Sequence, residues 1–231
     1  MAKRGPVPKR SDEVMGHHRT TEAVTRTPSA AAVPVSQPSA QGEDWHPMAE
    51  RFYAAFGASG QSFYFEPSDW AVLKILTDHM SQLLRSPMLN AELFSAVLGQ
   101  AEEMMTTEAS RRRMRLETPV EKHAAPPVNE EWHLRAQTFY TALDESGQSI
   151  YYQPSDWVFA EFVADCLSKH YQRVGKMSGR VFSMFRQAFT MLLATESARR
   201  ALDLELTQTD TRDIEAEVAE YMSKVDAELG W

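Results

Sequence analysis

Apolar residues recur every three to four positions along much of this chain, which is the period of an amphipathic α-helix. Phe52, Ala55 and Phe56 keep this period in one stretch, and Phe139 and Leu143 keep it in another. No run of useful length alternates apolar and polar residues in the way that a half-buried strand does. The pattern therefore predicts an all-α protein.

The second of these stretches repeats the first. Residues 45–70 and 132–157 align without a gap at an offset of 87, and 15 of the 26 aligned positions are identical. After one extra residue in the second copy, the match resumes at Phe94 and Phe182, and it ends with residues 107–112 against 195–200. This period exceeds the 20–50 residues of solenoid repeats, so it predicts two tandem homologous helical units. Two similar surfaces on one chain favour assembly or binding over a single catalytic cleft.

Short polar segments predict where the helices begin and end. Ser59-Gly60, and its copy Ser146-Gly147, should end the first helix with glycine in the left-handed conformation. The aromatic residues that follow are predicted to be extended up to the next proline. A second helix is predicted over about 69–84. The capping residues predicted for the later helices are Ser68 and Ser155 for the second, Asn90 and Ser178 for the third, and Thr107 if a fourth begins there.

Composition divides the chain into five segments. They are a disordered arm rich in Pro, Ser and Ala (1–44), a first repeat (45–117), a linker (118–131), a second repeat (132–206) and an acidic C-terminal helix (207–231). The arm carries almost no bulky apolar residues, so burial cannot offset the entropy lost on ordering it. The net charge is −8, but the arm has six Lys and Arg against five acids, whereas 207–231 has two against seven. A basic arm and an acidic end suggest two different partners.

The basic residues of the arm form an extended strip that suits a phosphate backbone or a minor groove, although a solubilising tail has the same composition. The residues assigned to DNA here are Lys3, Arg4, Lys9, Arg10, His17, His18 and Arg19. A second cluster, Arg111, Arg112, Arg113 and Arg115, stands at a predicted helix C-terminus, and the second copy retains only Arg199 and Arg200. Such a cluster either complements the helix dipole or contacts phosphates and acidic partners.

The acidic end carries an apolar stripe at helical spacing, made by Ile214, Val218, Tyr221, Val225 and Leu229. A single amphipathic helix of this length is marginal alone in water, so the stripe is expected to dock on another surface. That surface is either the chain's own repeats and neighbouring subunits, or a different protein that receives the helix in a groove.

Patterns typical of catalysis or metal binding are missing from the sequence. It has no nucleotide-binding fingerprint or HExxH motif, and the Ser-Gly-Gln-Ser segments have no flanking strand to form a nucleophile elbow. The single cysteine, Cys166, excludes an internal disulfide, and no apolar run approaches the roughly 20 residues that cross a bilayer. We expect a soluble cytosolic protein that is not an enzyme, with no cofactor, no metal and no membrane partner.

The repeated aromatic residues allow two interpretations. Tyr64, Trp70, Tyr151 and Trp157 either stack on bases, as in single-strand binders, or hold the first helix of each repeat against the second. The second interpretation predicts that Trp70 and Trp157 are buried at equivalent positions.

In combination, these motifs resemble the terminase small subunits of tailed phages that infect actinobacteria. The resemblance rests on the arm segment Arg4-Gly5-Pro6-Val7-Pro8-Lys9-Arg10-Ser11, on the central block from Trp45 to Trp70, on Thr107-Glu108 with the following arginines, and on Val218-Ala219-Glu220-Tyr221. It covers both ends and the first repeat closely and the second repeat more loosely. The duplicated central block is the departure from the family pattern.

The resemblance implies a non-catalytic packaging factor in the host cytoplasm. Such a subunit binds double-stranded viral DNA as a homo-oligomer and delivers it to the large terminase subunit, which carries the ATPase and nuclease. The acidic C-terminal stripe is then the expected contact with the large subunit. The alternative is a helical interaction scaffold or adaptor without affinity for DNA, which the negative net charge favours.

Overall fold

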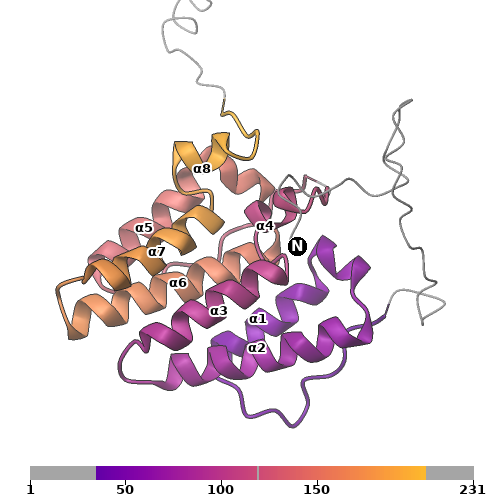
Figure 1. Ribbon diagram of the computed structural model, residues 1–231, viewed down its shortest axis with the longest axis horizontal. Helices are drawn as coiled ribbons and strands as arrows, with labels where there is room; N and C mark the ends of the chain where they lie inside the picture. Colours follow the sequence, from indigo (N-terminus) through magenta and orange to yellow (C-terminus); the bar gives the residue numbers. More distant parts are fainter. Residues whose placement is uncertain (1–34, 119, 207–231) are drawn as a thin grey trace, which may run out of the picture.

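The computed structural model describes residues 35–118 and 120–206, which form eight α-helices and two 3₁₀ helices (Figure 1). Repeat 1 consists of α1 (Pro47–Gly57), η1 (Gly60–Tyr64), α2 (Pro67–Arg85), α3 (Ala91–Glu103) and α4 (Glu108–Arg113). Repeat 2 consists of α5 (Leu134–Glu145), η2 (Gly147–Tyr151), α6 (Pro154–Arg173), α7 (Gly179–Met191) and α8 (Glu196–Arg200). The all-α class is confirmed, and no strand occurs within the described ranges.

Side-chain caps begin most of these helices. His46 caps α1 and His133 caps α5, each by accepting a hydrogen bond at Nδ1 from a backbone N–H two residues on, at 3.2 Å in both repeats. Asn90 caps α3 and Ser178 caps α7, as predicted. Thr107 caps a separate fourth helix, as Thr195 does in repeat 2. These oxygen and nitrogen acceptors satisfy N–H groups that the first turn of a helix leaves unpaired.

The second helix of each repeat begins earlier than predicted. Its N-caps are Glu66 and Gln153, so the prediction that Ser68 and Ser155 cap these helices was wrong. Proline follows each cap at the first helical position, where its missing N–H costs nothing and its fixed φ suits the helix. A capping box closes each turn, because the aspartate at the third position accepts a bond from the cap's own N–H.

The segment between the first and second helices was also predicted incorrectly. Gly60 and Gly147 do not end the preceding helix in the left-handed conformation; each begins a 3₁₀ helix, η1 or η2. The aromatic stretch is therefore mostly helical, and only Phe65 and Tyr152, with the cap residue after each, are extended before the proline. Proline restricts the residue immediately before it, so it does not hold a longer stretch extended.

The two tryptophans clamp their repeats in the same way. Trp70 is 1% exposed and Trp157 is 2% exposed. Each contacts the tyrosine of the first helix and the aromatic residue before the proline, with centroid distances of 6.1 and 5.1 Å for Trp70 and 6.0 and 5.0 Å for Trp157. The prediction of equivalent buried positions is confirmed, and both indoles belong to the core instead of a base-stacking surface.

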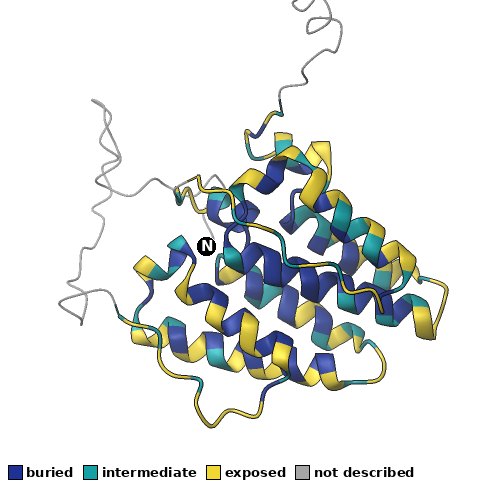
Figure 2. Cartoon of the chain, turned by 180° about the vertical axis from the view of Figure 1, so that it is seen from behind, coloured by how far each residue is buried: buried dark blue, intermediate teal, exposed yellow. Residues whose placement is uncertain are grey.

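One large hydrophobic core runs through both repeats, and a second, small cluster contains Ala109, Leu193 and Leu204. Helix α6 lies in the middle, between α5 of its own repeat and α1 of repeat 1, while α3 packs against α7 (Figure 1). Of the 20 residues of α6, 14 are buried, whereas its counterpart α2 buries eight of 19. The central helix is accordingly dark blue and the outer helices alternate between buried and exposed positions (Figure 2). The predicted domain boundaries remain a prediction, but the repeats do not have separate cores.

Over the described residues, the helices are too short or too polar to pass through a bilayer.

Candidate functional site

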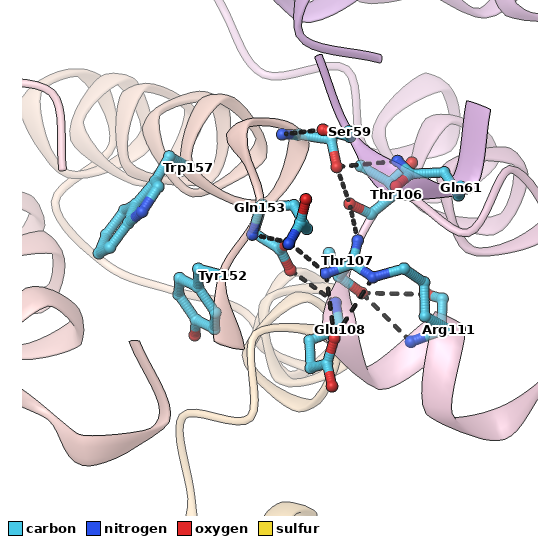
Figure 3. Close-up of polar contacts among 12 residues, drawn as sticks. Ser59, Gln61, Thr106, Thr107, Glu108, Arg111, Tyr152, Gln153 and Trp157 are labelled. Atoms are coloured by element: carbon cyan, nitrogen blue, oxygen red, sulfur yellow. Dashed lines mark hydrogen bonds and ion pairs between the residues drawn. The ribbon is translucent and has the colours of Figure 1, made fainter. Parts of the chain in front are cut away.

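A polar junction joins the two repeats at the N-terminal end of α6. Repeat 1 contributes Ser59, which caps η1, Gln61 from η1, and the segment that leads into α4 (Figure 3). Ser155 Oγ accepts a hydrogen bond from Gln61 Nε2 at 2.9 Å and donates one to the Thr106 carbonyl at 2.7 Å. The Ser155 N–H donates to Ser59 Oγ at 3.0 Å. One serine of α6 thus contacts three parts of repeat 1.

Asp156, the next residue of α6, anchors α4. Its Oδ1 accepts the Glu108 N–H at 2.6 Å, and its Oδ2 accepts the Gln153 N–H at 2.8 Å and Arg111 Nη2 at 2.5 Å. Both members of the Arg111–Asp156 pair are fully buried. Burial raises the pKa of Asp156, and the positive charge of Arg111 opposes that increase.

Arg111 is therefore part of the protein interior. Its guanidinium also donates to Glu108 Oε2 at 3.1 Å and to the Thr106 carbonyl at 3.3 Å (Figure 3). A buried guanidinium whose donors are used by carboxylates and carbonyls has none to offer a phosphate. Although the sequence pattern placed Arg111 with the DNA-binding arginines, the structure places it at the repeat junction.

The other three arginines of that cluster lie at the surface in different settings. Arg112 is half-buried, donates to Glu108 Oε1 at 2.8 Å, and lies 4.8 Å above the Tyr151 ring. Arg113 pairs with Glu102, and burial lowers the pKa of the Arg113 guanidinium. Arg115 is exposed and has a left-handed backbone, with φ at 55°. The structure therefore brings three arginines to the surface around α4, of which two are already partly neutralised.

A hollow of about 790 Å³ lies beside α4 and is lined by residues of both repeats. Its lining combines two arginines, three acids, an aromatic ring and several apolar or neutral side chains: Glu108, Arg112, Arg115, Leu116, Glu117, Thr118, Val120, Tyr151, Leu202 and Asp203. This mixed charge gives the hollow no strong preference for an anion. Among the described residues, no group of three or more His, Cys, Asp or Glu is placed to hold a metal ion.

Many residues singled out in the sequence lie outside the described ranges. They are the arm residues Lys3, Arg4, Lys9, Arg10, His17, His18 and Arg19, and the C-terminal residues Ile214, Val218, Tyr221, Val225 and Leu229. Tyr64 and Tyr151, the alternative base-stacking residues, are within the described ranges. Tyr64 is 40% exposed and Tyr151 is partly buried beneath Arg112.

Sequence reasoning missed the junction itself. Ser59 was interpreted only as a residue that ends a helix and Ser155 only as a cap, and neither Gln61 nor Asp156 was assigned to a contact between the repeats. A signal was available, because all four are identical in the two repeats and a glutamine is not needed to end a helix. Identical polar residues beyond those that capping requires indicate a shared contact surface.

Comparison with known proteins agrees with this duplicated architecture. The profile of the family described as "Phage terminase small subunit" matches the chain twice, over residues 3–124 and 117–230. The Gene 5 proteins of Mycobacterium phages D29 and L5 are each 27% identical over 136 residues, which cover 55% of this chain and 86% of the relative. No solved structure matches the chain. The chain therefore belongs to the phage terminase small subunit family, whose place is in the packaging of phage DNA.

Proposed function

We propose that this chain is a non-catalytic subunit of the packaging machinery that binds double-stranded phage DNA and brings it to the large terminase subunit in the host cytoplasm. The observation that carries the proposal is the double family match, which begins at residue 3 and so includes the basic arm. In the helical body, the buried charges of Arg111 and Asp156 hold the two repeats together.

The arm supplies most of the affinity for DNA. Each Lys or Arg that neutralises a phosphate releases condensed counterions, which lowers the slope of log K against log salt by about 0.9 per contact. Six Lys and Arg lie within the first 26 residues. Arg112, Arg113 and Arg115 add a smaller contribution, because Arg112 and Arg113 already pair with Glu108 and Glu102. Arg111 contributes none.

A salt titration of DNA binding tests this assignment. Deletion of residues 1–26 should reduce the magnitude of the log–log slope by up to about 5, whereas Arg115→Gln should change it by at most about 1. Arg200→Gln is the matched control, because Arg200 is an exposed arginine on the short helix that corresponds to α4. An unchanged slope after the deletion would move the DNA contact onto the helical body.

The C-terminal stripe is the proposed contact with the large subunit. Its apolar residues would lie in a groove of that partner, and the acidic residues between them would repel DNA and favour a basic rim. A double variant, Val218→Ser with Tyr221→Ser, should retain DNA binding and lose stimulation of the large subunit's ATPase. Glu217→Gln, on the polar side, should retain both activities. If the double variant still stimulates the motor, the stripe has a different role.

A scaffold without affinity for DNA is the second candidate, and the net charge of −8 favours it. A gel shift with phage-end DNA at two salt concentrations separates the two functions. The packaging function requires a shift that weakens at the higher salt, and no shift at either concentration would favour the scaffold.

A further inference from the structure

The two repeats carry opposite charge over one matched stretch. In repeat 2, residues 166–195 contain no Asp or Glu, and they contain five basic residues: Lys169, Arg173, Lys176, Arg180 and Arg186. In repeat 1, the corresponding residues 79–107 contain one basic residue, Arg85, against three acids: Glu92, Glu102 and Glu103. With His counted as neutral, the net charge is therefore +5 in repeat 2 and −2 in repeat 1, in a chain whose net charge is −8.

Four of these basic residues belong to the connection between α6 and α7 or to α7 itself. Arg173 ends α6, Lys176 lies in the turn, and Arg180 lies in the first turn of α7. The turn is held against α6, because His170 Nε2 donates a hydrogen bond to the Lys176 carbonyl at 3.0 Å. Arg186 follows Arg180 by six residues, which is about 9 Å along the helix axis. The connection lies at one edge of the helical body (Figures 1 and 2). We call Arg173, Lys176, Arg180 and Arg186 the basic corner.

The charges of the basic corner are available to solvent. Arg173, Lys176 and Arg186 are exposed, and none of them forms an ion pair within residues 35–118 and 120–206. Arg180 pairs with Glu92 of α3 at 3.1 Å, and the two side chains are 70% and 81% exposed. Such an exposed pair contributes little, because solvent screens it. The basic corner can therefore attract an anion from outside the chain.

Helix stability accounts for only one of the charges near the turn. Arg173 lies in the last turn of α6, where a cation complements the negative end of the helix dipole. Lys176 and Arg180 lie at the N-terminus of α7, where the dipole favours an anion. Repeat 1 has the favourable arrangement, since Glu92 occupies the place of Arg180 in the first turn of α3. Two cations at this end of α7 are unfavourable for the helix, which indicates a role outside the fold.

Repeat 1 shows that the fold does not require the basic corner. The counterparts of its four residues are, in order, Ser86, Met88, Glu92 and Leu98. The basic residue at the equivalent corner of repeat 1 is Arg85, whose guanidinium donates to both carboxylate oxygens of Asp44, at 3.0 and 2.9 Å. The same helices thus form with and without these charges, and the exposed basic surface is particular to repeat 2.

The phosphate backbone of a duplex suits this surface. Double-stranded DNA carries one negative charge for about every 1.7 Å of its axis, so cations spread along a helix meet several phosphates. The approach is open, because a Cβ added at Gly179 would meet no other atom within 4 Å. Cations that are fixed on two helices would also hold the duplex in one orientation across the body, which is the role of phosphate contacts.

We propose that the basic corner is a second contact with the phosphate backbone of double-stranded DNA, located on repeat 2 and missing from repeat 1. This site rests on the proposed function, because it adds a contact on the helical body to the one in the arm. Once the arm has bound, the second contact is intramolecular, so a few charges are sufficient to hold the duplex against α6 and α7.

A salt titration with two matched triple variants of the full chain tests the proposal. The corner variant removes the three charges that have no ion pair: Arg173→Gln, Lys176→Gln and Arg186→Gln. The control variant removes three charges that pair with acids elsewhere: Lys74→Gln, Arg85→Gln and Arg200→Gln. Both variants change the net charge equally. The corner variant should reduce the magnitude of the log–log slope by about 2–3, and the control by less than about 1. Unchanged circular dichroism would show that both are folded.

Removal of the acid that pairs with the basic corner should have the opposite effect. Glu92→Gln frees Arg180, so the slope should become steeper by up to about 0.9. Glu43→Gln frees Lys74 in the same way, away from the basic corner, and should leave the slope unchanged. A surface that only solvates the protein would respond equally to the two changes.

Photo-crosslinking locates the contact. Lys176→Cys, in a Cys166→Ala background and labelled with an aryl azide, should crosslink to duplex DNA. Met88→Cys is the matched control, because Met88 is the counterpart of Lys176 and is 60% exposed. It should give far less crosslinked product, and equal yields at the two positions would contradict a contact particular to repeat 2.

The outcomes separate this proposal from the proposed function. If deletion of residues 1–26 reduces the slope while the corner variant matches the wild type, the basic corner is not a DNA contact and the proposed function stands. Equal losses in the two triple variants would show a long-range effect of net charge and would also overturn the proposal. An unchanged slope with lost stimulation of the large subunit's ATPase would assign the basic corner to an acidic protein surface instead. A wild type that does not bind DNA would overturn both.

Discussion

The buried pair at the repeat junction allows a quantitative test of what holds the two repeats together. Replacing Asp156 with Ala leaves the Arg111 guanidinium buried without its closest carboxylate and removes the acceptor of the Glu108 and Gln153 N–H groups. The repeats supply their own control in Asp69, which has the same place in α2 and accepts the Glu66 N–H at 2.8 Å. In the described chain, only Asp156 has the additional role of joining the repeats.

Asp156→Ala and Asp69→Ala should differ severalfold in the unfolding free energy that each removes. Removing one member of a buried ion pair destabilises a protein by about 3–5 kcal/mol when the remaining charge is left unpaired. The lower end of this range applies here, because Arg111 keeps its 3.1 Å ion pair with Glu108. Loss of a helix-capping carboxylate alone costs about 1 kcal/mol. With a urea m-value of about 2 kcal/mol/M, Asp156→Ala should lower the unfolding midpoint by about 1.5 M, and Asp69→Ala by about 0.5 M.

Urea unfolding followed by circular dichroism measures both values. Repeating it at tenfold lower protein concentration separates contacts within the chain from contacts between chains, since only the latter depend on concentration. The double variant Asp156→Ala with Arg111→Met should be less destabilised than the sum of its two single variants, because it leaves no unpaired charge. Equal midpoints for Asp156→Ala and Asp69→Ala, or additive costs in the double variant, would refute the assignment.

Three further outcomes are expected from the packing. Trp70→Ala and Trp157→Ala should each cost about 3–5 kcal/mol of unfolding free energy in thermal or urea unfolding, and a cost below about 1 kcal/mol at either would show that the clamp is not shared. Phe94→Ala should cost a similar 3–5 kcal/mol of unfolding free energy, whereas Phe182→Ala should change it by no more than about 0.5 kcal/mol, because Phe94 is buried and Phe182 is 54% exposed. The Cys166 thiol is buried and its pKa is raised by that burial, so a thiol reagent should label it slowly until urea is added. In a Cys166→Ala background, His79→Cys places a thiol at the exposed position of α2 that corresponds to Cys166, and this thiol should react without urea. Equal labelling rates for the two thiols would contradict the buried position of Cys166 in α6.

The sequence by itself determined the local structure and the duplication. Helical period, capping residues such as Asn90 and Thr107, and the clamping tryptophans act within about one helical turn or within one repeat, so they are visible in the order of residues. The prediction failed where two local preferences competed. Proline at the first helical position moved the caps to Glu66 and Gln153, and the segment expected to be extended formed a 3₁₀ helix instead.

Only the tertiary structure decided which of the repeated residues face each other. Asp156 and Asp69 have the same neighbours in sequence, yet one is buried against Arg111 and the other is not. Helix α1 and the start of α4 contact α6, whereas the equivalent segments of repeat 2 make no comparable contact with α2 within the described residues. The same asymmetric packing buries Arg111, which the sequence pattern had grouped with the predicted DNA-binding arginines. The sequence immediately around the two aspartates is the same, so the difference arises from which helices pack over each of them.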